Sequence, residues 1–314
     1  MRPKSGASAG KSSTATATTG TDSPAQPYIG RFAPTPSGDL HLGSLYAAAA
    51  SYLDARAHGG RWLLRIEDLD RPREVSGSAA GILHTLERFG FEWDGQITRQ
   101  RDRGEFYEAA LRDLEARNLT FACSCSRLQL EDELRYPGTC RNRTANAGQT
   151  AIRLKIESGY ITFADRIQGS YRQDVSAAVG DIILRRRDQI FAYVLAVVVD
   201  DAAQGITHIV RGADLLDNTP RQIYLQRLLG AAEPRYAHVP VLTEADDAKL
   251  AKSRRSVHLS ADSPLPQLLA VFAMLGLTAP AQLRTGAIHE AWAWAFAQWS
   301  IKNVPKRLNV RVSD

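Results

Sequence analysis

The stretch RFAPTPSGDLHLGS, residues 31–44, decides the fold. Residues 28–32 are typical of a short strand, and the prolines and glycine that follow predict a turn. Leu42–Ala57, rich in alanine and followed by two glycines, predicts a helix, and residues 61–66 predict a second strand. This order is a βαβ unit. It implies an α/β fold with a parallel sheet and a ligand at the carboxyl ends of the strands.

Two segments have the composition of a phosphate-binding site. The N-terminus of the predicted helix offers free N–H groups, His41 can donate a ring N–H, and Gly43 lets a ligand approach the backbone. Lys249 and Lys252 lie in a polar loop over 244–256, from which two ammonium groups can neutralise a triphosphate. The alternatives are a turn capped by a histidine and a solvated basic loop. The spacing from the strand and the presence of both motifs favour the nucleotide.

The composition is that of an ordinary globular protein. The 314 residues suffice for roughly two domains, and 44% are hydrophobic and 23% charged. The longest apolar run, residues 191–199, is too short for a transmembrane helix. A net charge of +5 and 32 arginines hint at a polyanionic partner. On composition alone, however, a codon bias toward arginine is the favoured explanation.

The N-terminal residues and the cysteine count bear on the compartment. Residues 1–27 predict a disordered extension, with an organellar transit peptide as the less favoured alternative. This extension has no apolar segment of the kind that directs export. Three cysteines, an odd number, argue against a disulfide framework. We therefore expect a cytoplasmic protein without membrane attachment.

The remaining elements follow from periodicity and turn signals. Helices are predicted over 78–89, 104–118, 219–229, 264–275 and 288–299, and strands over 151–156, 161–167, 181–186 and 206–210. The last helix presents Trp292, Trp294, Phe296 and Trp299. We expect these aromatic side chains in the core and in a docking surface, not in a base-stacking platform.

All three cysteines lie in one polar insertion over about 120–150. Cys123, Cys125 and Cys140 are typical of ligands to tetrahedral Zn²⁺, which needs a fourth group. The closest upstream histidine is His84, far along the chain. The alternatives are three free thiols, or a site completed by water or by Glu133.

Several motifs together resemble the class I aminoacyl-tRNA synthetases. Residues 41–44 (HLGS) look like the HIGH motif, and residues 249–253 (KLAKS) look like the KMSKS loop. Residues 31–35 (RFAPT) and 65–70 (RIEDLD) narrow the resemblance to the glutamyl branch. The cysteine insertion and the short length narrow it to paralogues of the glutamyl-tRNA synthetase catalytic domain that modify the queuosine base of tRNA(Asp).

The resemblance implies a Rossmann-like catalytic domain with a site for ATP and one for glutamate. It places ATP at Pro34, His41, Gly43, Ser44 and Lys252, and gives catalytic roles to His41, Lys249 and Lys252. It places glutamate at Arg31, Phe32, Ala33, Pro34, Thr35, Glu67, Tyr193 and Arg211. Arg31 is its choice for a substrate carboxylate, and Glu67 suits the α-ammonium. Taken singly, each could instead be a structural ion pair or a buried tyrosine.

The resemblance also implies two metal ions, and the sequence departs from the family pattern at two positions. It makes Tyr136 the fourth ligand of a structural zinc ion with Cys123, Cys125 and Cys140, and Mg²⁺ is expected with ATP. Val194 stands where asparagine is usual, which puts a polar contact near the amino acid in doubt. Ala251 stands where serine is usual, but both loop lysines are kept.

We expect five segments along the chain. They are the extension over 1–27, the first half of the nucleotide-binding domain over 28–119, a zinc-bearing insertion over 120–205, the second half over 206–260 and a helical segment over 261–314.

The predicted function is ATP-dependent activation of L-glutamate and its transfer to queuosine at the wobble position of tRNA(Asp), by a monomer. One alternative is a truncated glutamyl-tRNA synthetase acting at the tRNA 3′ end. Against it, the sequence ends some 55 residues after the KLAKS loop. Another alternative is a zinc-stabilised RNA-binding module with a vestigial nucleotide site.

Overall fold

The computed structural model describes residues 27–126, 128–130, 135–143, 149–157, 159–243, 259 and 263–312. The predicted extension lies outside these ranges except for residue 27. The loop over 244–256, with Lys249 and Lys252, and residue Glu133 also lie outside them.

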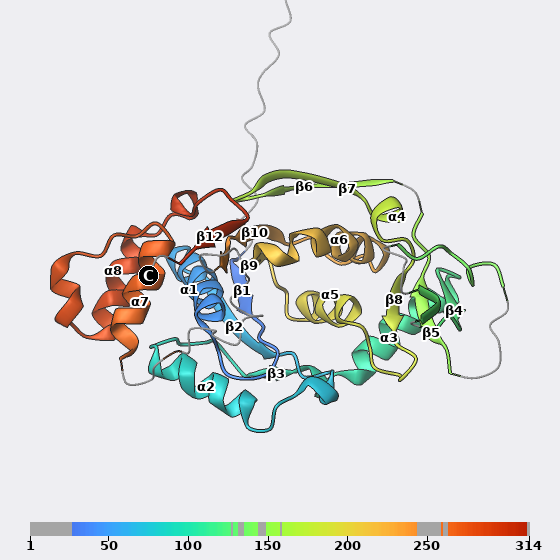
Figure 1. Ribbon diagram of the computed structural model, residues 1–314, viewed down its shortest axis with the longest axis horizontal. Coiled ribbons are helices and arrows are strands. Elements are labelled where there is room, and N and C mark those ends of the chain that lie inside the picture. Colours follow the sequence, from blue (N-terminus) through green and yellow to red (C-terminus); the bar gives the residue numbers. More distant parts are fainter. Residues whose placement is uncertain are drawn as a thin grey trace, which may run out of the picture.

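A parallel sheet forms the middle of the molecule (Figure 1). Strands β1 (Ile29–Phe32) and β2 (Arg61–Ile66) pair in parallel, and β3 (Thr98–Arg99) extends the sheet beyond β2. Helix α1 (Leu42–Ala57) is the crossover between β1 and β2. The predicted βαβ unit and the α/β fold class are therefore confirmed.

The chain changes direction on the other side of β1. Strand β9 (His208–Gly212) lies beside β1 and pairs in parallel with β10 (Arg235–Val239). A hydrogen bond of 2.9 Å from the N–H of Thr207 to the carbonyl of Ile29 joins β1 to this second pair. Because β2 and β9 leave β1 on opposite sides, a crevice opens at the carboxyl ends of β1 and β9, where α/β proteins bind ligands.

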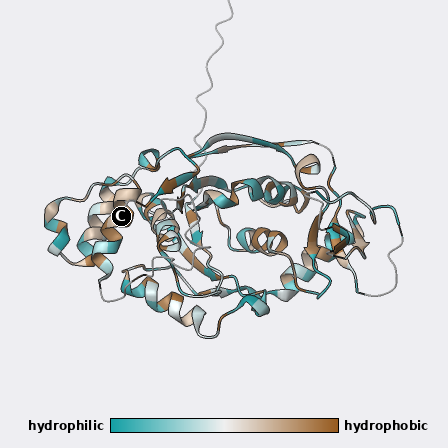
Figure 2. Cartoon of the chain, viewed as in Figure 1, coloured by the Kyte–Doolittle hydropathy of each residue, from teal (hydrophilic) through white to brown (hydrophobic). Residues whose placement is uncertain are grey.

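The insertion forms its own antiparallel sheet at one end of the molecule (Figure 1). Strands β4 (Thr120–Cys123), β5 (Ala151–Leu154) and β8 (Ile182–Arg185) pair in that order. The hairpin of β6 (Tyr160–Asp165) and β7 (Gly169–Asp174) runs back along the molecule over α6 (Thr219–Leu228) and is largely hydrophilic (Figures 1 and 2).

The other elements complete the molecule. The remaining helices are α2 (Ser78–Arg88), α3 (Gly104–Ala116), α4 (Val175–Ala178), α5 (Tyr193–Ala203), α7 (Pro264–Met274) and α8 (Ile288–Gln298). The 3-10 turns are η1 (Arg71–Arg73), η2 (Gln100–Asp102), η3 (Leu128–Leu130), η4 (Ala213–Asn218), η5 (Ala281–Thr285) and η6 (Ile301–Asn303). Within the described ranges, none of the helices is both long and apolar enough to cross a membrane.

The C-terminal helices α7 and α8 pack on α1, and a hydrogen bond joins α8 to the end of α2. Trp292 is buried among Tyr52, Phe91 and Phe272, and its indole N–H donates to the carbonyl of Phe89 at 2.8 Å. Strand β12 (Asn309–Arg311) then pairs in parallel with β11 (Val241–Thr243), which follows β10. The predicted core role of Trp292 is therefore confirmed.

Most predicted elements occur with shorter ends, but several elements were missed. The predicted strand over 206–210 is displaced to 208–212, because the Thr207 hydroxyl accepts a hydrogen bond from the N–H of Ile29 at 2.8 Å just before the strand starts. Helix α5 was missed because most of it is formed by the continuous apolar run over 191–199, which gives little amphipathic signal. Strands β7 and β10–β12 are short or polar, so their sequences resemble loops.

Trp292→Ala should lower the free energy of unfolding by about 3–5 kcal/mol, because it removes a large buried ring that no neighbour can replace. Urea unfolding followed by circular dichroism measures the change. Leu128→Ala, at a side chain 79% exposed, is the control and should change stability by less than about 0.5 kcal/mol. Equal midpoints for the two variants would contradict the assignment of Trp292 to the core.

Candidate active site

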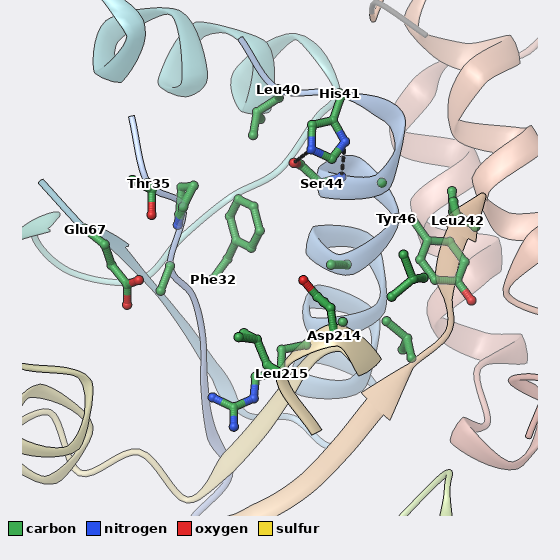
Figure 3. A pocket seen from close by; sticks show the side chains of 18 of the residues that line it. Phe32, Thr35, Leu40, His41, Ser44, Tyr46, Glu67, Asp214, Leu215 and Leu242 are labelled. Carbon is green, nitrogen blue, oxygen red and sulfur yellow. Dashed lines mark hydrogen bonds between the residues drawn. The ribbon is translucent and has the colours of Figure 1, made fainter. Parts of the chain in front are cut away.

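A cavity of about 580 Å³ opens at the carboxyl ends of β1 and β9, against the N-terminus of α1 (Figure 3). All the predicted ATP and glutamate residues that lie within the described ranges line it: Arg31, Phe32, Ala33, Pro34, Thr35, His41, Gly43, Ser44, Glu67, Tyr193 and Arg211. Residues 180 positions apart in sequence thus face one space, which is large enough for a nucleotide or an amino acid.

The α1 end of the cavity is suited to phosphate. His41 is the N-cap of α1, and its Nδ1 accepts the N–H of Ser44 at 3.2 Å (Figure 3). With Nδ1 accepting, the ring proton is on Nε2, which lies 3.2 Å from Ser44 Oγ and donates to it (Figure 3). The first turn of α1 carries no acidic residue, so its positive end is not neutralised. His41 therefore caps the helix, which was the alternative interpretation, and its ring lines the α1 end of the cavity.

Gly43 keeps this end of the cavity open. A Cβ at position 43 would lie 3.1 Å from Nδ1 and Cε1 of His41, closer than most side-chain contacts. A larger residue would displace the imidazole from its capping position. The backbone here must therefore pass directly under the ring.

The opposite end of the cavity holds a buried charge network. Arg65 is fully buried and donates to Asp201 Oδ1 at 2.8 Å and to Glu67 Oε1 at 3.3 Å. Arg31 Nε donates to the same Asp201 carboxylate at 3.2 Å. Glu67 directly follows β2 and faces the cavity (Figure 3). Two arginines thus balance two carboxylates within one site.

Burial and charge set the ionisation of the two acids differently. Burial raises the pKa of Glu67 above its usual range, although Arg65 and Arg31 oppose the rise. Burial also disfavours the charged form of Asp201, but the guanidinium groups of Arg31 and Arg65 hold its pKa below the usual value. Arg31 is therefore engaged by Asp201, in the structural ion pair that the sequence analysis named as its alternative.

Arg211 differs from the other two arginines because none of the described carboxylates forms an ion pair with it. Its Nε donates to His238 Nε2 at 3.1 Å, and its Nη2 donates to Thr219 Oγ1 at 2.8 Å and to Gln222 Oε1 at 2.7 Å. Its Nη1 is buried and has no hydrogen-bond partner. Among the described residues, all the partners of Arg211 are neutral or weakly basic groups. A buried cation without a counter-ion is costly, so the site favours an anionic ligand.

His238 is held in the form that serves Arg211. Asp165 Oδ2 lies 2.6 Å from His238 Nδ1, so Nδ1 carries the proton and Nε2 is free to accept from Arg211. Burial lowers the pKa of His238 despite the nearby Asp165 carboxylate. The imidazole thus stays neutral beside the guanidinium.

Sequence reasoning missed several polar groups in the wall of this cavity, among them Asp214 and Tyr46. Asp214 lies on η4 and faces α1, and Tyr46 lies on α1 with a buried hydroxyl that has no hydrogen-bond partner (Figure 3). Asp214 Oδ1 lies 2.5 Å from the position that a Cβ on residue 212 would take, so a larger residue there would displace the Asp214 carboxylate. The Gly212–Asp214 spacing was the available signal.

The insertion gathers the three cysteines and Tyr136. The three Sγ atoms lie within 4.8 Å of one another. Cys125 Sγ lies 3.5 Å from Cys140 Sγ, and Tyr136 Oη lies 3.4 Å from Cys123 Sγ. Zn–S bonds of 2.3 Å in a tetrahedron separate the ligand atoms by about 3.7 Å, so these separations fit such a site.

Neighbouring groups favour an ionised sulfur and orient the tyrosine. Burial disfavours the Cys140 thiolate, but hydrogen bonds from the Ser124 backbone and from Cys125 lower the pKa of Cys140 to about 6. The N–H of Cys140 donates to Tyr136 Oη at 2.9 Å. The guanidinium of Arg153 lies 3.7 Å from the centre of the Tyr136 ring, which fixes the plane of the ring.

The chain belongs to the class I tRNA synthetases. The family described as "tRNA synthetases class I (E and Q), catalytic domain" matches residues 29–282, and the chain is accordingly a ligase.

Two relatives are identical to the chain at more than half of the aligned positions. The chain is 55% identical, over 92% of its length and 98% of the relative, to "Glutamyl-Q tRNA(Asp) synthetase" of Pseudomonas fluorescens. It is 54% identical, over 89% of its length and 95% of the relative, to a protein of the same name from Ectopseudomonas mendocina.

A solved structure shares the fold. The glutamate-tRNA synthetase of Elizabethkingia anophelis superposes with a TM-score of 0.76 at 23% identity, covering 92% of this chain and 68% of that one.

Arg65→Met should lower the free energy of unfolding by about 3–5 kcal/mol, because Asp201 and Glu67 would keep a single buried guanidinium between them. Chemical denaturation at neutral pH measures the loss. Arg61→Met is the matched control, since Arg61 lies on the same strand with its side chain exposed. If both variants unfolded at the same denaturant concentration, the network would not be what holds β2 to α5.

Proposed function

We propose that this enzyme activates L-glutamate with ATP and transfers it to the queuosine base at the wobble position of tRNA(Asp), the reaction that the names of its relatives describe. The observation that carries the proposal is the unbalanced guanidinium of Arg211 in the same cavity as Glu67 and the N-terminus of α1. In this cavity Arg211 faces a carboxylate of glutamate, Glu67 faces its ammonium group, and the N-terminus of α1 faces the phosphates of ATP.

The charges orient the amino acid. Arg211 binds the side-chain carboxylate, and its buried Nη1 supplies a donor without a competing partner. Glu67 accepts the α-ammonium. Tyr193 lines the same space, and its desolvation, together with the charge of Glu67, raises the pKa of its hydroxyl and keeps it a donor. The α-carboxylate is then left to face the phosphates at α1.

The first step needs no protein nucleophile. An α-carboxylate oxygen attacks the α-phosphorus of ATP, the bond to the β-phosphate bridging oxygen breaks, and pyrophosphate leaves with the electron pair. His41 and the N-terminus of α1 hold the phosphates. Lys249 and Lys252, which lie outside the described ranges, neutralise the leaving group, with Mg²⁺ supplied alongside ATP.

In the second step an acceptor hydroxyl attacks the acyl carbon of glutamyl-adenylate. The new C–O ester bond forms, the C–O bond to the phosphate breaks, and AMP leaves with the electron pair. The hydroxyl proton passes to a phosphate oxygen of AMP. The protein contributes position and charge to both steps.

We propose that Cys123, Cys125, Cys140 and the phenolate of Tyr136 hold a structural zinc ion. The separations of their ligand atoms, and the hydrogen bonds that favour a thiolate at Cys140, support this donor set. A bound Zn²⁺ would tie β4 to the polar segment that follows it. These residues lie outside the first cavity, so the metal takes no part in either step.

Pyrophosphate exchange tests the proposal. With glutamate, ATP and labelled pyrophosphate but no tRNA, the enzyme should form labelled ATP. Arg211→Met should raise the KM for glutamate by about 100-fold, because the substrate loses a charged hydrogen-bond partner worth about 2–3 kcal/mol. Arg235→Met, an exposed arginine on β10, is the control and should leave the KM unchanged.

The acceptor is tested with two tRNA(Asp) preparations. Labelled glutamate should transfer to tRNA(Asp) that carries queuosine and not to tRNA(Asp) that lacks it. Undiminished transfer to the second preparation would show that the acceptor is the 3′ ribose, as in an ordinary glutamyl-tRNA synthetase. Binding of RNA without any exchange would show an RNA-binding module instead.

Tyr136→Phe should weaken zinc binding by about tenfold or more, because it removes one of four ligands and keeps the ring. Zinc content after dialysis against a graded chelator series measures the change. Tyr160→Phe is the control, since Tyr160 is exposed on β6 of the same insertion. Equal zinc retention in both variants would show that another group completes the site.

A further inference from the structure

A second cavity of about 380 Å³ lies between the insertion sheet and helices α5 and α6. Its wall includes side chains of the zinc-site segment, of β8 and of the start of both helices: Leu130, Tyr136, Arg153, Val179, Asp181, Ile182, Ile183, Ala192, Tyr193, Val194, Asn218 and Arg221. None of the steps derived above uses this space, apart from Tyr193.

The second cavity adjoins the first through Tyr193. This residue begins α5 and lines both spaces. Glu67 and Arg211, which bind the amino acid in the proposed function, line the first cavity together with Tyr193, and their charges act on its hydroxyl. A group held in the second cavity therefore approaches glutamyl-adenylate without passing through the ATP end.

Two arginines give the second cavity an excess of positive charge. Arg153 is more than nine-tenths buried and its Nε has no hydrogen-bond partner, although its Nη1 donates to the carbonyl of Asp181 at 2.7 Å. The Nε of Arg221 is likewise without a partner, and burial lowers the pKa of this guanidinium, with Asp217 as the opposing charge.

The described acidic groups nearby already have partners. Among the described residues of the wall, Asp181 is the one carboxylate; it accepts the N–H of Ile156 at 2.8 Å and pairs with Arg141 at 3.3 Å. Asp217 accepts the hydroxyl of Tyr171 at 2.5 Å. Among the described residues, the Nε atoms of Arg153 and Arg221 therefore have no hydrogen-bond acceptor, and an anion from outside the chain can bind to them.

The rest of the wall suits a flat, partly polar group. Val179, Ile182, Ile183 and Val194 form an apolar surface. The Asn218 side chain, at the start of α6, caps no backbone N–H in the part of the chain that the structure describes. An aromatic ring against the aliphatic wall, an amide for its edge and arginines for an anion are the features that bind a nucleotide.

We propose that the second cavity receives the acceptor nucleotide of the RNA, turned out of its stack, with its base against the wall of β8 and α5 and its phosphodiester on Arg221. The inference rests on the proposed function, because it assigns the acceptor of the second step. The base then lies beside Tyr193. There the acceptor hydroxyl of the nucleotide reaches the acyl carbon of glutamyl-adenylate. Arg153 links this site to Tyr136, so the insertion shapes the acceptor site.

Separate measurement of the two steps tests the inference. Arg221→Ala should lower kcat/KM for queuosine-bearing tRNA(Asp) by about tenfold or more, while exchange without tRNA changes by less than about twofold. Arg221→Lys, which keeps the charge, should recover part of the loss. Arg227→Ala is the matched control, since Arg227 lies on the same helix and pairs with Glu233 at the surface.

Filling the cavity is the independent test. Ile183→Trp places a large ring where the base would lie and should abolish transfer while exchange and the melting temperature are kept. The affinity for the tRNA, measured by filter binding, should fall with Arg221→Ala and not with Arg227→Ala.

Wild-type exchange followed by undiminished transfer in both Arg221→Ala and Ile183→Trp would overturn the acceptor site and leave the proposed function standing. Absence of exchange in the wild-type enzyme would overturn the proposed function, and the acceptor site with it.

Discussion

The buried guanidinium of Arg65 is the constraint on which the site depends. It joins β2 to α5 by holding Asp201 and Glu67, and Asp201 in turn holds Arg31 on β1. Ion pairs between buried groups of opposite charge therefore hold β1, β2 and α5 together, although β1 and β2 are distant from α5 in the sequence. The guanidinium of Arg211 forms no ion pair with a described carboxylate, so the first cavity favours an anionic ligand.

The sequence was most informative where local signals and chemistry coincide. The RFAPTPSGDLHLGS stretch predicted the first strand, the turn and helix α1 with its exact bounds. The predicted site residues that the structure describes line one cavity, although their roles stay predictions. The three cysteines and Tyr136 also lie together, which the spacing in the sequence could suggest but not establish.

The rest depended on contacts that no local pattern records. Asp200 and Asp201 looked like the polar end of an apolar run, yet both are buried ion-pair partners on α5. The resemblance chose Arg31 for a substrate carboxylate and gave Arg211 only as a further glutamate-site residue. In the structure Arg31 donates to the buried Asp201, whereas the described partners of Arg211 are uncharged. The second cavity is formed by five segments between residues 130 and 221, so sequence spacing gave no indication of it.

The parallel pairing of β11 with β12 has a further consequence. Val241 and Leu242 of β11 line the first cavity, and their strand neighbours are Asn309 and Val310 near the carboxyl end of the sequence. The rim of the first cavity is thus hydrogen-bonded, through β11, to β12, the last strand among the described residues. A purification tag or fusion partner joined directly behind β12 would pull on that rim, so a reporter for binding studies belongs at the opposite terminus.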